Sequence, residues 1–204
     1  MVVPMDDRST SDEWYTDRLR ERSGARWKKL VPNPYRRNIS KLRLGRVLDI
    51  GCGIGRCLGF NHGNGIGIDH NLASVEICRG LGFEAYTPDD FAVQPRGTFD
   101  SLLLSHVLEH MSESEGLAML KSYVPFLRDG GRVILITPQL AGQRSDPTHV
   151  RYVGQIEAAR LLADLGATAI ETRSHPFPAF VGKLFRHNEN IAIGTVRKNP
   201  AASD

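Results

Sequence analysis

Short apolar runs alternate with longer amphipathic stretches from residue 46 onward. The short runs are rich in Val, Ile and Leu and end at Gly, Pro or Asp, which is typical of buried strands. The longer stretches carry apolar residues at helical spacing behind polar caps. This alternation predicts a parallel sheet covered by helices. Strands are expected at Val47–Ile50, Gly65–Ile68, Glu84–Tyr86, Phe99–Leu104 and Arg132–Thr137, and helices at Leu72–Arg79, Ser112–Leu127 and Gln155–Leu165.

The two ends of the chain extend this pattern. Asn33 and Pro34 suit the cap and first turn of a helix that reaches about Lys41. Thr168–Ser174 and Asn190–Val196 are two further β-prone segments around an aromatic stretch. We therefore expect a single domain over residues 1–204, with a disordered start (1–10), an N-terminal helical lid (11–45) and an α/β core (46–204).

Composition narrows the class of protein. The three cysteines form no closely spaced pair, which favours reduced thiols over a disulfide framework or a zinc knuckle. The N-terminus lacks a basic-then-apolar leader, and no apolar run reaches the length of a membrane span. We therefore expect a cytoplasmic protein without membrane insertion.

A basic stretch precedes the first strand. Between Arg18 and Arg46 there are eleven Lys or Arg residues and one acid, Glu21, although the net charge of the chain is only +3. A solvated helix face accounts for most of these charges. The stretch can also form a basic lid that closes over a ligand, with Trp14, Tyr15 and Tyr35 beside it, or a patch that faces RNA.

Three glycines at alternate positions follow the first strand. Gly51, Gly53 and Gly55 permit positive φ angles and a close approach to the backbone. A dinucleotide fingerprint would need its third glycine at position 56, where this chain has Arg56. The second strand ends in Asp69, about twenty residues after the loop, where a carboxylate can bind both ribose hydroxyls of a nucleoside. Asp69 could instead cap the next helix, but Asn71 could do so equally well.

The stretch Val47–Arg56 resembles motif I of class I methyltransferases that depend on S-adenosylmethionine (SAM). The resemblance extends over Arg46–Thr137. It implies an α/β, Rossmann-like fold with a doubly wound seven-stranded sheet whose last strand is antiparallel, and SAM as the cofactor. In this family an acid after the third strand meets the adenine amino group and an apolar side chain covers the ring. Asp89 or Asp90, with Phe91, stands there, although either aspartate could cap a helix. The SAM site implied in this way comprises Asp49, Gly51, Cys52, Gly53, Gly55, Asp69, His70, Asp90, Phe91 and Ser105.

Candidate acceptor chemistry follows the fourth strand. The N-P-P-Y or D-P-P-Y motif of many nitrogen methyltransferases is absent, and His106-x-x-Glu109-His110 stands in its place. These residues could simply cap and pack the next helix. They also resemble the E-x-x-E-H metal cluster of ubiquinone-pathway O-methyltransferases and plant small-RNA 2′-O-methyltransferases, with His106 in place of the first Glu. By that resemblance His149 completes a set of metal ligands, namely His106, Glu109, His110 and His149. Mg²⁺ is the expected ion, and Mn²⁺ and Zn²⁺ remain open because imidazole ligands are unusual for Mg²⁺.

The chemistry of methyl transfer explains what such a cluster would do. The SAM sulfonium already makes the methyl group electrophilic, so the enzyme must align the acceptor and remove its proton. A metal ion lowers the pKa of an alcohol that it binds. His106 or His149 is the candidate catalytic base, with or without a metal.

The acceptor itself is indicated by resemblance. Asp146-Pro-Thr-His149 is similar to bacterial O-methyltransferases of sugars and polysaccharides, and the tail is similar to actinobacterial sugar methyltransferases such as the methylmannose-polysaccharide group. We therefore predict a SAM-dependent O-methyltransferase whose partner is a small-molecule or oligosaccharide acceptor, with a homodimer left open. An RNA 2′-O-methyltransferase and a non-catalytic SAM-binding protein are the alternatives. The tail offers an aromatic wall for a sugar, or core residues beneath the last strands, in Phe177, Phe180 and Phe185 with His175 and His187.

Overall fold

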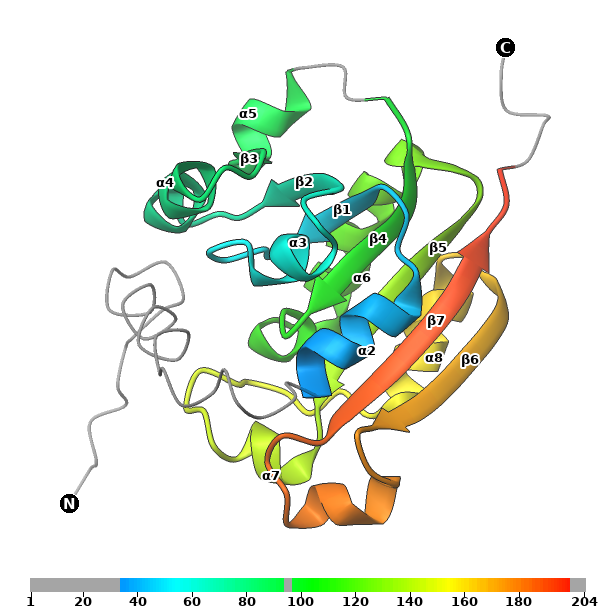
Figure 1. Ribbon diagram of the computed structural model, residues 1–204. Helices are drawn as coiled ribbons and strands as arrows, with labels where there is room; N and C mark the ends of the chain where they lie inside the picture. The colour runs from blue at the N-terminus through cyan, green and yellow to red at the C-terminus, as the bar shows by residue number, and fades with distance from the viewer. Residues whose placement is uncertain (1–33, 94–96, 199–204) are drawn as a thin grey trace.

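The computed structural model describes residues 34–93 and 97–198, which form a seven-stranded sheet in the order β3-β2-β1-β4-β5-β7-β6 (Figure 1). The first five strands pair in parallel, and β7 is antiparallel to both of its neighbours. This is the expected fold. The strands are β1 (Val47–Ile50), β2 (Gly65–Ile68), β3 (Ala85–Tyr86), β4 (Phe99–Ser105), β5 (Leu127–Pro138), β6 (Thr168–His175) and β7 (Glu189–Val196).

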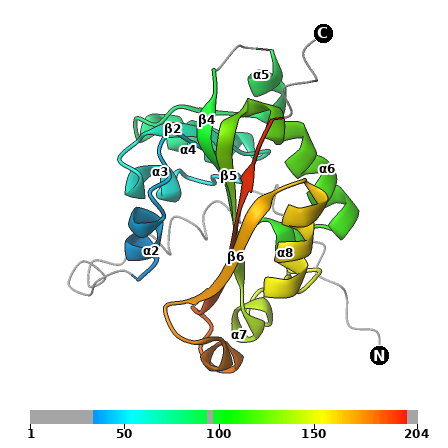
Figure 2. The ribbon, with the colours of Figure 1, turned by 90° about the vertical axis from the view of Figure 1, so that its right-hand side faces the viewer.

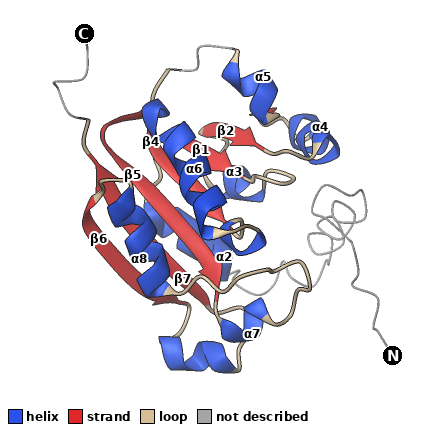
Figure 3. Ribbon diagram, turned by 180° about the vertical axis from the view of Figure 1, so that it is seen from behind, coloured by secondary structure: helices blue, strands red, loops and turns tan. Residues whose placement is uncertain are grey.

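Helices cover both faces of the sheet. The view along the sheet in Figure 2 shows α2, α3 and α4 on one side and α6 and α8 on the other, and Figure 3 shows α6 and α8 from the front. The α-helices are α2 (Pro34–Leu42), α3 (Arg56–Phe60), α4 (Leu72–Gly80), α5 (Pro88–Ala92), α6 (Glu113–Tyr123), α7 (Leu140–Gln143) and α8 (Gln155–Asp164). Short 3₁₀ turns are η2 (Leu108–His110), η3 (Val124–Phe126) and η4 (Ala179–Lys183).

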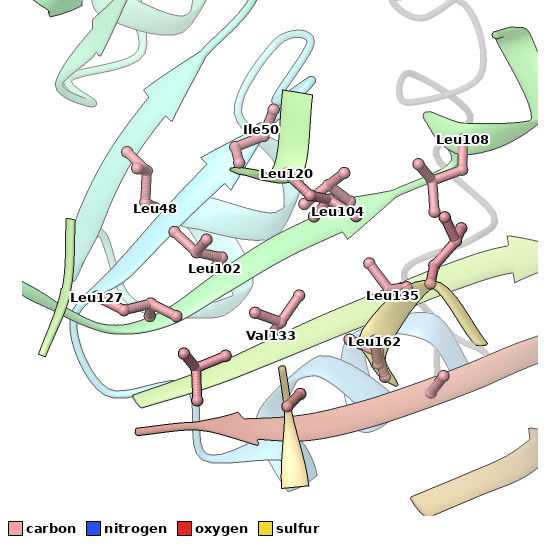
Figure 4. Packing of buried hydrophobic residues seen from close by; sticks show 14 of the residues in the cluster. Leu48, Ile50, Leu102, Leu104, Leu108, Leu120, Leu127, Val133, Leu135 and Leu162 are labelled. Carbon is pink, nitrogen blue, oxygen red and sulfur yellow. The ribbon is translucent and has the colours of Figure 1, made fainter. Parts of the chain in front are cut away.

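Alternation along the strands builds a separate core on each face. In β4, Leu102 and Leu104 face the core under α6 and α8, whereas Leu103 faces the core under α2, α3 and α4. Figure 4 shows the first of these cores. Because Val47 of β1 also faces the second core, Asp49 points to the side of α2 and α3.

Two boundaries differ from the prediction around residue 125. The helix expected to reach Leu127 ends at Tyr123 and passes into η3, because Pro125 has no N–H with which to continue it. Strand β5 begins at Leu127, which pairs with Phe99, and not at Arg132. The register shifts before Arg132, and Gly130 accommodates the irregularity with a φ of 67°.

The topology gathers the candidate residues at one edge of the sheet. Parallel strands β1, β2, β4 and β5 end at the same edge, and the connection from β6 to β7 lies there too because β7 runs back. The glycine loop, Asp69, the segment after β4, the segment after β5 and residues 176–188 therefore share this edge (Figure 1). The predicted lid lies mostly outside the described residues, which include only its helix α2 and the following turn. Among the described helices, none is long and apolar enough to cross a bilayer.

Candidate active site

The glycine loop after β1 has left-handed backbone at each of its three glycines. The φ angles are 73° at Gly51, 53° at Gly53 and 79° at Gly55. A Cβ at Gly51 would overlap the side chain of Val107, and one at Gly55 would lie 2.6 Å from the Sγ of Cys78. The close approach predicted for a ligand is therefore, at these two positions, an approach of the protein to itself.

Hydrogen bonds within the protein hold this loop. The N–H groups of Gly51 and Cys52 donate to the carbonyl of Ile68, at 2.8 and 3.0 Å. The N–H of Gly53 donates to Asp69 Oδ2 at 2.8 Å. These groups are already used, so the loop offers a ligand its shape and its carbonyl oxygens more than free donors.

Asp69 joins the loop to the second strand. Its Oδ1 accepts from the N–H of Asn71 at 2.9 Å, while Asn71 itself caps α4 by accepting from the N–H of Ser74. The helix-cap alternative for Asp69 is thus taken by Asn71. Each carboxylate oxygen retains a second lone pair, so Asp69 can fix the glycine loop and still accept hydrogen bonds from hydroxyls.

Asp49 is a buried acid behind the loop. It is 1% exposed, and its Oδ2 has no hydrogen-bond partner among the described residues. Burial and the charge of Asp69 raise its pKa to about 7, against an opposing effect of Arg56. An unpartnered buried carboxylate at this place fits a cationic ligand, and SAM carries an ammonium and a sulfonium.

Phe91 is a core residue in this structure. It is 2% exposed, and its ring centroid lies 4.9 Å from that of Phe126 and 6.1 Å from that of Tyr123. The Phe91 ring points into the core under α6, because the face of α5 that carries it is turned inward. The sequence-based assignment of Phe91 to the cofactor stays a prediction.

The neighbouring aspartates stay accessible. Thr87 caps α5 by accepting from the N–H of Asp90, so neither aspartate is the cap. Asp90 pairs with Arg79 at 3.7 Å and remains exposed, as does Asp89. Two other expected cofactor residues differ in access, since the side chain of His70 is exposed and that of Cys52 is buried.

Helix α2 brings Tyr35 close to the glycine loop after β1. Its hydroxyl lies 2.5 Å from Ser105 Oγ and 3.0 Å from Cys57 Sγ. The guanidinium of Arg56 lies over the Tyr35 ring, 4.4 Å from its centroid. Tyr35 therefore links the loop after β1 to the end of β4, where Ser105 stands.

His106 is clamped between two carboxylates. Its Nε2 lies 2.9 Å from Glu189 Oε1 and its Nδ1 3.2 Å from Glu109 Oε1, on backbone with a φ of 60°. Burial alone would lower the pKa of this imidazole, but the two carboxylates raise it to about 10. His106 is thus a cation at neutral pH with both ring nitrogens engaged. The expectations that it acts as a base or as a metal ligand stay predictions.

Glu109, His110 and His149 form the cluster that can hold a metal ion. One ligand atom from each lies within 4.8 Å of the others. Glu109 is 0% exposed, and among the described residues its oxygens make no well-directed hydrogen bond but pair with the imidazole of His106 at 3.2 Å. His149 Nε2 lies 4.0 Å from Glu109 Oε1. The structure thus brings together three of the four predicted ligands.

Backbone carbonyls orient both histidines of this cluster. Nδ1 of His110 lies 3.1 Å from the carbonyl of Thr148, and Nδ1 of His149 lies 3.1 Å from that of Gln143. In a neutral imidazole Nδ1–H donates to the carbonyl and Nε2 carries the lone pair. This pairing is the usual second shell of a metal-binding histidine.

Ionisation of the cluster suits a cation. Burial lowers the pKa of His149, which is therefore neutral at pH 7 despite the nearby charge of Glu109. Burial alone would raise the pKa of Glu109, but the His106 imidazolium leaves it below its usual value. An anionic carboxylate at Glu109 and a neutral imidazole at His149 are thus in place.

The two segments of the cluster are tied together by backbone. Turn η2 directs the side chain of Glu109 inward. The backbone carbonyl of Glu109 accepts hydrogen bonds from the N–H groups of Val150 and Arg151 at 2.8 and 3.3 Å. The loop that carries His149 is thereby fixed against the end of β4. Sequence reasoning missed Glu189 and gave Arg56 no role; an acid that opens the last strand was the available signal for Glu189.

Some aromatic side chains of the tail are exposed, and others are partly buried. Phe177 is 48% exposed and Phe180 is 73% exposed, so neither is a core residue. Phe185 is partly buried, and its ring lies 5.5 Å from those of Phe177 and His187. Asn188 fixes this segment, accepting from the N–H of Phe177 and donating to Gln139.

The family model described as "Methyltransferase domain" matches residues 20–180. The chain belongs to this family. It is thus a SAM-dependent methyltransferase, which agrees with the glycine loop, with Asp69 and with the strand order.

Curated relatives are tRNA methyltransferases. The chain is 37% identical over 151 residues to "tRNA (carboxymethyluridine(34)-5-O)-methyltransferase alkbh8" of Xenopus tropicalis, covering 72% of this chain and 24% of that protein. The protein of the same name from Macaca fascicularis is 37% identical over 92 residues, which are 44% of this chain and 14% of the relative. The chain therefore spans about a quarter or less of the length of these relatives.

Solved structures share the fold at low identity. Magnesium protoporphyrin IX methyltransferase from Synechocystis, with bound S-adenosylhomocysteine (SAH), has a TM-score of 0.65 at 17% identity, covering 93% of this chain and 96% of that one. The methyltransferase domain of a bacterial Hen1 protein has a TM-score of 0.59 at 15% identity, covering 78% and 94%.

Proposed function

We propose that the protein transfers the methyl group of SAM to a hydroxyl of a sugar or polysaccharide, at a site where Glu109, His110 and His149 hold a divalent metal ion. The observation that carries the proposal is the convergence of these three ligand atoms within 4.8 Å at the edge that also holds the glycine loop. A donor site and a site for activating an acceptor hydroxyl would then adjoin each other.

The nitrogen and oxygen ligands of this cluster favour some metal ions over others. Two imidazole nitrogens and one carboxylate, with positions left open for other ligands, resemble catalytic transition-metal sites. Mg²⁺ prefers a shell of oxygen atoms and usually keeps several waters. We therefore expect Mn²⁺ or Zn²⁺ to bind more tightly than Mg²⁺. When bound, the ion would lower the pKa of a coordinated hydroxyl.

The surrounding residues support a role in proton transfer. His149 is neutral at pH 7 and its Nε2 faces Glu109, so this nitrogen can act as metal ligand or as general base, but not as both at once. His106 cannot accept a proton near neutral pH and instead balances the charges of Glu109 and Glu189. The cluster would therefore work with one permanent cation beside it.

An oxygen acceptor agrees with the tRNA methyltransferase relatives, whose names describe 5-O methylation in tRNA. A sugar acceptor is supported by the exposed rings of Phe177 and Phe180, which lie on the β6–β7 connection at the same edge of the sheet. Flat apolar rings with nearby polar groups suit the faces of pyranose sugars.

Metal binding can be tested without knowledge of the acceptor. Calorimetry of the chelator-stripped protein with MnCl₂, ZnCl₂ and MgCl₂ should show one site, with Mg²⁺ the weakest. His149→Ala and His110→Ala should each weaken Mn²⁺ binding at least about 100-fold, since changes in the second shell alone cost 10- to 100-fold. His62→Asn is the matched control, because His62 is exposed and lies outside the cluster. Equal Mn²⁺ binding by all three variants would contradict the metal centre.

The acceptor class needs a transfer assay. Radiolabelled SAM with a panel of mono- and oligosaccharides, lipids and RNA, with Mn²⁺ or with chelator, should label a sugar hydroxyl in the metal-loaded reaction. Labelled RNA instead would favour the second candidate, an RNA methyltransferase, which the tRNA relatives and the basic stretch 18–46 support. RNA binding that weakens steeply with salt would accompany that result. Binding of SAM without transfer to any acceptor would favour a non-catalytic SAM-binding protein.

A further inference from the structure

Two loops meet in a basic surface at the edge of the sheet that carries the metal cluster. Residues 139–145 follow β5, and residues 176–188 connect β6 to β7. Together these two segments contain three exposed cations and no acid. Turn η4 lies against α7, as Figure 1 shows beside the start of β7. We call the three cations, Arg144, Lys183 and Arg186, the basic rim.

Close packing holds the two loops of the rim together. Gly182 packs against the side chain of Gln139, which is the N-cap residue of α7. A Cβ at Gly142, within α7, would lie only 2.7 Å from the carbonyl oxygen of Arg186. Every cation of the rim lies within two positions of one of these contacts. The two segments therefore present their charges from one packed unit.

The charges of the rim are not neutralised by the protein. None of the three cations forms an ion pair with any residue that the structure describes. Nε of Arg186 donates to Nε2 of His187 at 3.2 Å, which leaves its two Nη groups without a described hydrogen-bond partner. The acid that follows the second loop, Glu189, is buried and paired with His106. Because like charges at one edge repel each other, a bound anion would stabilise this surface.

The rim adjoins both parts of the proposed acceptor site. Arg144 directly follows Gln143, whose carbonyl oxygen lies 3.1 Å from Nδ1 of His149 in the metal cluster. Phe180 and Lys183 are three positions apart in the 3₁₀ turn η4, a spacing at which side chains lie above one another. An exposed ring and a cation therefore share one face of this turn. A sugar stacked on that ring would bring a substituent to the rim.

We propose that the acceptor is a phosphorylated sugar, whose phosphoryl group is bound by the basic rim while a hydroxyl reaches the metal cluster. This inference rests on the proposed function and narrows its substrate from sugars in general to sugar phosphates. Guanidinium groups bind pairs of phosphate oxygens, and the lysine ammonium adds a point charge. A phosphate monoester carries about two negative charges near pH 7 and accepts several hydrogen bonds. It therefore matches three cations better than a single carboxylate does.

Binding to metal-free protein tests the rim separately from the metal cluster and from methyl transfer. The protein is freed of metal ions with a chelator, which is then dialysed away. The 1-phosphates of glucose, galactose and mannose are titrated calorimetrically, together with the three parent sugars and glucuronate. At least one 1-phosphate should bind about 10-fold or more tightly than both its parent sugar and glucuronate, since hydrogen bonds to charged groups have that value.

Substitutions in the rim identify the residues responsible. Arg144→Gln, Lys183→Gln and Arg186→Gln should each weaken binding of that 1-phosphate about 3- to 10-fold and leave the affinity for the parent sugar within about 2-fold. Arg197→Gln is the matched control. Arg197 is exposed and forms no ion pair with a described residue, but it follows the end of β7, at the opposite edge of the sheet. Its removal changes the net charge equally and should leave the affinity unchanged.

Three results would overturn this proposal. The first is no gain in affinity from the phosphate over the parent sugar or glucuronate. The second is an equal loss in Arg197→Gln, which would show only general attraction of anions. The third is a hexauridylate that binds more tightly than every sugar phosphate and depends on the same residues, which would assign the rim to RNA.

Methyl transfer distinguishes this inference from the proposed function. If the metal-loaded enzyme methylates a neutral sugar with the same KM as its 1-phosphate, this inference alone fails. A KM about 10-fold lower for the 1-phosphate, lost in Arg186→Gln but not in Arg197→Gln, would support it. If neither kind of sugar is methylated, the proposed function fails, whatever the rim binds.

Discussion

The donor loop and the acceptor cluster lie at one edge of the same sheet but are built in different ways. After β1 and β2, backbone groups hold one another, and Asp69 closes the loop through the N–H of Gly53. After β4 and β5, charged side chains hold one another, with His106 between Glu109 and Glu189. The donor half is thus held by contacts between residues that are close in sequence. The acceptor half depends on contacts between distant residues, such as His106 and Glu189, which are 83 positions apart.

The largest effect is expected where the acceptor half loses its cation. His106→Gln leaves Glu109 and Glu189 buried and facing each other without a counter-charge. In metal-free protein this should lower the free energy of unfolding by about 3–5 kcal/mol, the range found when one partner of a buried ion pair is removed. Urea unfolding in the presence of chelator measures it, with the exposed His187→Gln as control. A loss below about 1 kcal/mol would mean that the ion pairs of His106 with Glu109 and Glu189 contribute little to the stability of the protein.

The same residue predicts how this loss depends on pH. Because the folded-state pKa of His106 is raised from 6.5 to about 10, its stabilising contribution is complete below about pH 6.5 and is lost as the pH rises through 10. The difference in stability between wild type and His106→Gln should therefore shrink steadily from pH 6.5 to pH 10. A difference that stays constant over this range would argue against an imidazolium at this position.

In the donor half, the largest effect should come from the first glycine of the loop. Gly51→Ala imposes a φ of 73° on a side chain and places its Cβ against Val107. We expect a loss of about 2–4 kcal/mol, of which the backbone conformation alone accounts for about 1–2 kcal/mol. Gly82→Ala isolates the backbone part, since Gly82 has a φ of 87° and open space around it. Adding Val107→Ala to Gly51→Ala should restore only the steric part; if the two glycine variants lose equally, Val107 is not the constraint.

This contrast also sets how much the sequence could predict. The strands and the glycine loop followed from apolar alternation and spacing, and Asp69 was found from its place after β2. The doubly wound sheet with its antiparallel last strand followed from the family resemblance. The burial of Phe91 against Phe126 could not be predicted, because the pattern does not say which face of α5 turns inward. The end of α6 was predicted too far along the chain, because Pro125 ends the helix within one turn.

The charge state of the histidines could not be predicted at all. His106 and His149 look alike in the sequence, yet one has two carboxylate partners and the other donates to a backbone carbonyl. Their pKa values shift in opposite directions, because two carboxylates raise the pKa of His106 whereas burial lowers the pKa of His149. Glu189, which decides the state of His106, reaches it only through the pairing of β5 with β7.

A smaller effect is expected at Asp49, where the donor half contains an unpartnered charge. Its folded-state pKa of about 7 lies above the unfolded value of 3.8, so the protein without ligand loses stability as the pH rises from about 4 to 7. Asp49→Asn should raise the free energy of unfolding by about 1–3 kcal/mol at pH 8 and leave it almost unchanged at pH 4. The same variant should weaken SAH binding. Thermal unfolding at the two pH values, with and without SAH, gives both readouts, and equal stabilisation at both pH values would rule out a buried charge.

The smallest effect on stability, and the sharpest on the acceptor side, is expected at Phe180. Because this ring is 73% exposed, Phe180→Ala should change the free energy of unfolding by less than about 0.5 kcal/mol. If the ring contacts the acceptor, the KM for the acceptor should rise about 2- to 10-fold, the value of one aromatic contact, while SAH affinity stays constant. Leu81→Ala removes another exposed apolar side chain, 59% accessible at the end of α4, and should change neither quantity. A change in SAH affinity in Phe180→Ala would show that the two halves are coupled through the β6–β7 connection, because Asn188 links that connection to Gln139 and Glu189 links it to His106. An unchanged KM would instead show that Phe180 does not contact the acceptor.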